Sequence, residues 1–81
     1  MIIVNQDKTE IINFDNTLNI ALYKDDKNGW EIYAGMKAPD DNYRTLGYYK
    51  TKERAKEILQ KIITVYHGAE MLMPVFEMPE K

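Results

Sequence analysis

The sequence predicts an α+β domain in which a five-stranded antiparallel meander packs against one C-terminal amphipathic helix. Before Thr51, apolar and polar residues alternate with a period of two, as in strands with one buried face. After Thr51, apolar residues recur every three to four positions, as on one side of a helix. The connections between the alternating segments are short and polar, which favours antiparallel pairing of neighbours. A chain of 81 residues allows one domain, assigned to residues 1–69, followed by a C-terminal extension at residues 70–81.

Two short strands are expected at the N-terminus. The first, Ile2–Asn5, ends at the polar turn formed by residues 6–8, and the second is Thr9–Phe14. The short connection between them predicts a hairpin. Residues 15–16 are Asp and Asn, which tolerate the backbone angles of a tight turn.

Three longer strands are expected next, at Leu18–Tyr23, Trp30–Lys37 and Tyr43–Tyr49. The Asn28-Gly29 pair between the first two is a strong hairpin signal, and the polar residues of 38–42 supply the following turn. Gly35 and Gly47 interrupt the last two strands, as at bulges or bends. A strongly bent, barrel-like sheet plugged by the helix is therefore an alternative to the open meander.

The change of period predicts a helix over Lys52–His67. Its apolar stripe consists of Ala55, Ile58, Leu59, Ile62 and Tyr66, widened by Ile63 and Val65. Thr51 fits the N-cap position, and Glu53 lies in the first turn, where the helix dipole favours an acid. Gly68 stands where a left-handed C-cap is expected.

The extension at 70–81 is too apolar for a solvated tail. Its candidate interaction residues are Met71, Met73, Phe76 and Met78. Pro74 cannot donate to a sheet ladder, so we expect an edge strand or an extended segment lying across the core. Packing within the same chain and burial in a second chain, by strand addition at a sheet edge, are both open alternatives.

Aromatic residues gather on the expected strands. The candidates for an interaction surface are Trp30, Tyr33, Tyr43 and Tyr49, with Tyr23 nearby. Such a face anchors protein partners, or stacks single-stranded nucleic acid next to the basic residues of 50–56. Cross-strand aromatic pairs also stabilise sheets without any ligand. The net charge of −2, from 11 basic and 13 acidic residues, disfavours a general nucleic-acid binder.

No pattern in the chain points to catalysis, a metal or a cofactor. There is no cysteine or serine to act as a nucleophile, and the single histidine, His67, complements the dipole at a helix C-terminus. The loop over residues 25–29 lacks the spacing of a calcium loop, because its glycine comes too early and no ligand glutamate follows at the right interval. We therefore expect a non-enzymatic protein without a cofactor.

The composition also favours a cytoplasmic protein without a membrane segment. A cysteine-free small domain is typical of a reducing compartment. The apolar run after Met1 is too short for a signal peptide, and no stretch approaches the roughly 18 apolar residues that span a bilayer.

Three segments resemble a family of small uncharacterised proteins of Firmicutes and their phages. They are residues 2–7 with 11–16, residues 46–51 running into 53–59, and residues 77–79. The resemblance covers most of the chain, and it implies a bacterial cytoplasmic or prophage setting with no site residues.

The leading functional hypothesis is thus a protein-interaction module, with self-association as one form. A nucleic-acid-associated accessory protein using the aromatic sheet face is the alternative.

Overall fold

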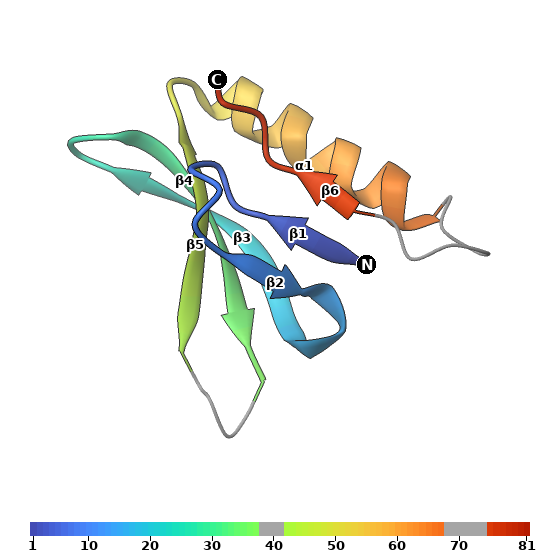
Figure 1. Ribbon diagram of the computed structural model, residues 1–81. Helices are drawn as coiled ribbons and strands as arrows, with labels where there is room; N and C mark the ends of the chain where they lie inside the picture. The colour runs from blue at the N-terminus through green and yellow to red at the C-terminus, as the bar shows by residue number, and fades with distance from the viewer. Residues whose placement is uncertain (38–41, 68–74) are drawn as a thin grey trace.

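The computed structural model describes residues 1–37, 42–67 and 75–81. Its elements, in chain order, are β1 (Ile2–Val4), β2 (Ile11–Asn13), the 3-10 helix η1 (Phe14–Asn16), β3 (Thr17–Asp25), β4 (Gly29–Met36), β5 (Tyr43–Tyr49), α1 (Lys52–His67) and β6 (Val75–Glu77). Figure 1 shows one helix packed beside short and long strands. The expected α+β class with one C-terminal helix is confirmed, and the helix has the predicted bounds.

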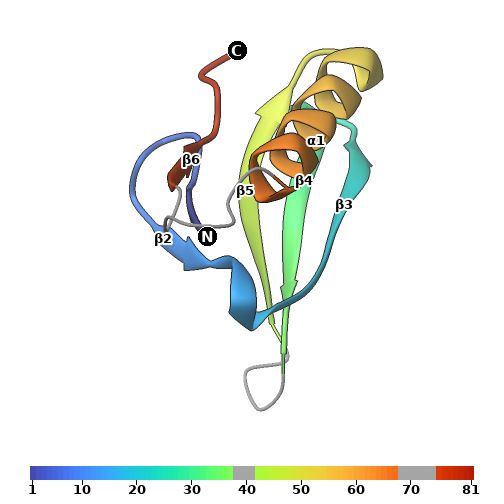
Figure 2. The same ribbon diagram turned by 90° about the vertical axis from the view of Figure 1, so that its right-hand side faces the viewer.

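The strands form two three-stranded sheets, so the predicted five-stranded meander is wrong. One sheet is the antiparallel meander β3-β4-β5, and the other has the order β2-β1-β6. In the second sheet β1 runs antiparallel to β2 and parallel to β6. Figure 2 shows β2 and β6 on one side of β5, with β3 at the opposite edge. Among the described residues neither sheet closes, so the barrel-like alternative is also wrong.

The break between the sheets is the single turn of η1. The Asn13 side chain accepts a hydrogen bond from the Asp15 N–H at 3.0 Å, which starts the turn. The Thr17 hydroxyl donates to the Phe14 carbonyl oxygen at 2.7 Å, which closes it. This local capping redirects the chain after only three residues of β2, and β3 therefore starts a separate sheet.

The C-terminal segment completes the sheet around β1. Ile3 of β1 is aligned with Ile12 of β2 and Phe76 of β6, and all three side chains are buried. Beyond β6, the Met78 N–H donates to the Val4 carbonyl oxygen at 3.0 Å, and the Met78 side chain is buried. Among the described residues β6 therefore lies at the edge of this sheet, and Phe76 and Met78 pack within their own chain.

The helix covers β4 and β5 of the meander. The Thr51 hydroxyl caps its first turn by accepting from the Arg54 N–H at 3.1 Å, as predicted. The residues Ala55, Ile58 and Ile62 face the sheet and are buried. Within the described ranges, the buried hydrophobic core consists of Met1, Ile3, Ile12, Ile32, Ala34, Leu46, Tyr49, Ala55, Ile58, Ile62, Phe76 and Met78.

Gln6, in the turn between β1 and β2, joins the two sheets at β5. Its N–H donates to the Leu46 carbonyl oxygen at 2.7 Å. Its side-chain amide accepts from the Tyr48 N–H at 2.8 Å and donates to the Tyr48 carbonyl oxygen at 2.9 Å. The amide thus takes the place of a neighbouring strand. Gly47 permits this approach, because a Cβ there would lie 2.9 Å from the Gln6 Cβ.

A bulge in β5 changes which of its residues face the helix. Ile32 is aligned with Gly47, but Tyr33 is aligned with Thr45, so Leu46 is the extra residue. Tyr48 therefore faces outward and Tyr49 is buried, whereas uninterrupted alternation places Tyr49 outside with Tyr43. The predicted pairing of Tyr43 and Tyr49 on one face is wrong for this reason.

Candidate functional site

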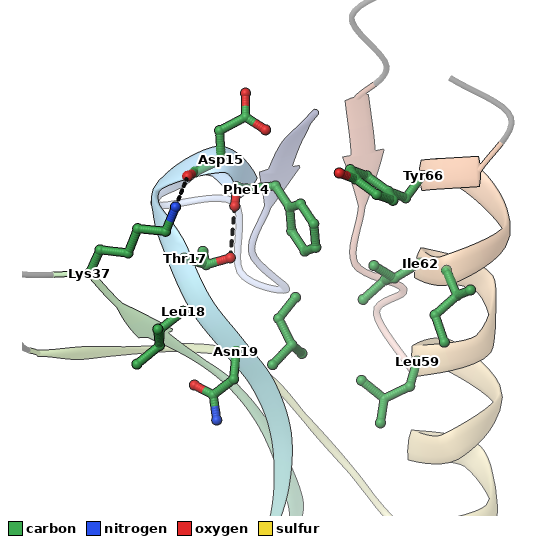
Figure 3. A pocket seen from close by; sticks show the side chains of 11 residues that line it. Phe14, Asp15, Thr17, Leu18, Asn19, Lys37, Leu59, Ile62 and Tyr66 are labelled. Carbon is green, nitrogen blue, oxygen red and sulfur yellow. Dashed lines mark hydrogen bonds between the residues drawn. The ribbon is translucent and has the colours of Figure 1, made fainter. Parts of the chain in front are cut away.

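A hollow of about 470 Å³ lies between β3 and α1. Its apolar lining comes from Leu18 and Ile20 of β3, from Leu59, Ile62, Ile63 and Tyr66 of α1, and from Phe14 of η1. Figure 3 shows the strand on one side of this hollow and the helix on the other. We call it the β3–α1 groove. It exists because α1 packs mainly over β4 and β5, so that Ile20 and Leu22 of β3 are only partly buried.

One end of the β3–α1 groove is closed by local interactions. The rings of Phe14 and Tyr66 meet across it with centroids 5.1 Å apart, tilted by 52°. Beside them, the Lys37 ammonium donates to the Asp15 carbonyl oxygen at 3.1 Å and ties the end of β4 to η1. The position of Phe14 thus follows from the turn that separates the two sheets.

The lining of the β3–α1 groove is exposed to a degree unusual for large apolar side chains. Leu18 is 74% exposed, Ile63 is 49% exposed and Tyr66 is 51% exposed. Single exposed apolar residues are common, but these three line one hollow. Together they form a surface that gains free energy when another apolar group covers it.

The backbone edge beside the β3–α1 groove is open. β3 is the longest strand, with nine residues, and it stands at the end of the order β3-β4-β5. None of the described strands pairs with its outer edge. At the opposite edge of the same sheet, Gln6 forms hydrogen bonds with the backbone groups of Leu46 and Tyr48 in β5. In the part of the chain that the structure describes, the meander therefore presents an open edge at β3, and the groove lies beside it.

The outer face of the meander, away from the helix, carries a second hollow of about 340 Å³. Its lining consists of Tyr23, Glu31, Tyr33 and Tyr43, and we call it the tyrosine hollow. The rings of Tyr33 and Tyr43 meet edge to face with centroids 5.6 Å apart. The Glu31 side chain is buried next to its cross-strand neighbours Tyr23 and Tyr48, and one of its oxygens accepts from the Thr45 hydroxyl at 2.6 Å.

The candidate aromatic residues fall on two different sides of the sheet. Tyr33 and Tyr43 lie together on the outer face, as described above. Trp30 packs against the core on the helix side, with the Lys52 ammonium 5.4 Å from its ring centroid. Tyr49 is buried, its hydroxyl donates to the Pro79 carbonyl oxygen at 2.7 Å, and burial raises its pKa to about 12. Tyr49 thus belongs to the core, and the partly buried Trp30 packs against that core on the side of the sheet opposite the tyrosine hollow.

The four candidate residues of the methionine-rich extension fall into two groups. Phe76 and Met78 are buried in the core of their own chain, which leaves neither side chain accessible to a partner. Met71 and Met73 lie outside the described residues.

None of the basic residues of 50–56 lines the tyrosine hollow. Lys52 lies over Trp30, on the helix side of the sheet. The Arg54 guanidinium forms an ion pair with Glu57. It also donates two hydrogen bonds to the Lys81 carbonyl oxygen, and the shorter of them is 2.7 Å. The acidic Glu31 lies at the centre of the outer face instead. This arrangement opposes phosphate binding on the tyrosine face.

The sequence patterns did not identify the β3–α1 groove or the role of Glu31. The sequence signal for the groove is the width of the apolar stripe on the helix. Ile63 makes this stripe wider than is needed to cover β4 and β5 alone. The signal for Glu31 is a single acid two residues before Tyr33 on the polar side of a strand.

No family model matches the chain, and neither a curated protein nor a solved structure does. The resemblance to small Firmicutes and phage proteins therefore stays a prediction. Within residues 1–37, 42–67 and 75–81, no helix is long and apolar enough to span a membrane. In the same part of the chain, no group of three or more acidic, histidine or cysteine side chains is arranged to hold a metal ion.

Proposed function

We propose that this protein is a non-enzymatic interaction module that binds an extended, apolar segment of a partner protein. The segment adds as a strand to the open edge of β3 and inserts alternate side chains into the β3–α1 groove. The observation that carries the proposal is the coincidence of a nine-residue open strand edge with an exposed apolar groove directly beside it. The cytoplasmic setting expected from the cysteine-free composition is part of the same proposal.

Strand addition uses both features of this site. The free N–H and C=O groups of an edge strand supply main-chain hydrogen bonds to any extended peptide, which gives affinity without sequence selectivity. Every second side chain of the added strand then points to the helix side of the sheet. There it meets Leu59, Ile63 and Tyr66, so the groove selects apolar residues at alternate positions.

A segment of another protein fits the β3–α1 groove better than a second copy of this chain does. If two copies paired through β3, each helix would stay over its own β4 and β5. With strands about 4.8 Å apart, the two helix axes would lie about 19 Å from each other. Packed helices lie at about 8–10 Å. A symmetric pair would therefore keep the two helices out of contact, and only Ile20 and Leu22 of the partner's β3 would reach toward each groove. A peptide strand can present larger apolar side chains at the same positions.

A peptide library tests this proposal. Ten-residue peptides displayed in random sequence are selected on the folded full chain, and the enriched peptides are titrated into the isotopically labelled protein. We expect enrichment of apolar residues at every second position and chemical-shift changes along β3 and α1. Ile63→Asp introduces a charge into the half-exposed lining and should weaken binding at least about tenfold.

Ile11→Asp is the matched control, because Ile11 is also exposed and apolar but lies on β2 in the other sheet. It should leave binding unchanged. Peptides that bind Ile63→Asp and the natural chain equally would refute the proposal, as would shifts confined to the β2-β1-β6 sheet. A dimer that appears as protein concentration rises, with shifts along β3 and no peptide bound, would assign the edge to a second copy instead.

A further inference from the structure

The tyrosine hollow places a buried negative charge beneath aromatic rings. Glu31 is 7% exposed, and it pairs across the strands with Tyr23 on one side and Tyr48 on the other. A carboxylate loses hydration when it is buried, and this cost is recovered only through hydrogen bonds or a paired cation.

The described part of the chain supplies Glu31 with only part of that compensation. The Thr45 hydroxyl donates to one carboxylate oxygen at 2.6 Å. Within the described residues no basic side chain forms an ion pair with Glu31. The second carboxylate oxygen of Glu31 has no partner in this part of the chain. Every fully buried side-chain oxygen here does have a partner, so this second oxygen is accessible from the hollow that Glu31 lines. The lining of the hollow therefore includes an acidic side chain with one oxygen that has no hydrogen-bond partner among the described residues.

The walls of the tyrosine hollow also favour a cation. The faces of tyrosine rings carry negative potential and attract cations placed over them. Tyr23, Tyr33 and Tyr43 line the same hollow as the carboxylate of Glu31. A ligand with positive charge gains from both the rings and the acid, whereas an anion is repelled by both.

Among organic cations, a guanidinium fits this combination best. It is planar and stacks flat on an aromatic ring while its N–H groups donate in the ring plane to a carboxylate. An ammonium is more strongly hydrated and loses more on entering the hollow. A quaternary ammonium has no N–H for the free oxygen of Glu31. We propose that the tyrosine hollow binds an arginine side chain of a partner protein, with Glu31 as its hydrogen-bonded counter-charge and Tyr23 as its stacking surface.

The test uses the full chain and two blocked tripeptides, acetyl-Gly-Arg-Gly-amide and its citrulline analogue, which has nearly the same shape without the charge. Binding is followed by the NMR shifts of the Tyr23, Tyr33 and Tyr43 ring protons. The arginine peptide should bind at least about fivefold more tightly than the citrulline peptide, and the difference should shrink in high salt. Lysine and trimethyllysine peptides should fall between the two.

Glu31→Gln keeps an acceptor for Thr45 and removes the charge, so it should erase the preference for arginine over citrulline. Tyr23→Ala should weaken arginine binding about threefold, whereas Tyr23→Phe keeps the ring and should not weaken it. Both variants should fold, because the Tyr23 side chain is largely exposed. Tyr66→Ala in the β3–α1 groove is the matched control and should have no effect. Equal binding of both peptides, or an arginine preference that survives Glu31→Gln, would overturn the proposal. Because Ile63→Asp acts only on the groove, this result is independent of the strand-addition proposal.

Discussion

Replacing Phe76 by alanine tests whether the C-terminal strand is part of the folding unit. Phe76 is 8% exposed and lies in β6, aligned with the buried Ile3 of β1. A buried phenylalanine cut to alanine costs about 3–5 kcal/mol of unfolding free energy, from lost apolar burial and the cavity left behind. A domain of this size has about 4–12 kcal/mol in total. Phe76→Ala should therefore remove a large part of the stability.

Val75→Ala is the matched control for this experiment. Val75 is the preceding residue of the same strand, points to the opposite face and is 59% exposed. Its truncation should cost no more than about 0.5 kcal/mol. With a urea m value of about 1 kcal/mol/M, the midpoint of Phe76→Ala should fall by about 3–5 M, while that of Val75→Ala moves by at most about 0.5 M. Equal midpoints for the two variants would refute the packing of β6 against β1.

Three further predictions follow from the core and from the joint between the sheets. Ile62→Asp buries an unpaired charge under α1 and should abolish the cooperative thermal transition, and a retained melt by circular dichroism would contradict the helix-on-sheet packing. Gln6→Ala removes side-chain hydrogen bonds to Tyr48 and should lower the unfolding free energy by about 1–3 kcal/mol in urea titrations, whereas no change would mean that the two sheets do not depend on this joint. Tyr49 has a pKa raised from 10.0 to about 12, so the unfolded chain releases this proton first and stability should fall as pH rises from 10 to 12. Tyr49→Phe should flatten that pH dependence, and an unchanged slope would count against a buried Tyr49.

Local patterns predicted the elements whose causes are local. The helix bounds were correct because the apolar stripe, the Thr51 cap and the change of period all agree. The Asn28-Gly29 pair predicts the hairpin between β3 and β4, and the two strands pair in one register from that turn as far as Asn19.

The errors come from interactions that a strand pattern does not encode. The capping of η1 by Asn13 and Thr17 divides the expected meander, yet these residues look like ordinary strand and turn positions. The parallel pairing of β1 with β6 joins the two ends of the chain, and no local pattern around Ile3 predicts that Phe76 is its neighbour. One extra residue, Leu46, reverses the sides on which the following two tyrosines lie.

The candidate sites were only partly predictable for the same reason. Tyr33 and Tyr43 share a face because they lie on neighbouring strands, and the period of two was sufficient to select them. The β3–α1 groove depends on where the helix rests across the sheet. That position is set by Ile58 and Ile62 packing over β4 and β5, and a helix pattern alone does not specify it.

Amide hydrogen exchange along β3 tests the central claim of an open strand edge most directly. In the free protein, alternate β3 amides should exchange rapidly at any protein concentration, while the Tyr48 amide, held by Gln6, should be protected although β5 is also terminal in its sheet. A library-selected peptide should protect the rapid set on β3. Uniform protection of β3 in the free monomer, or no gain of protection when the peptide is bound, would contradict the account.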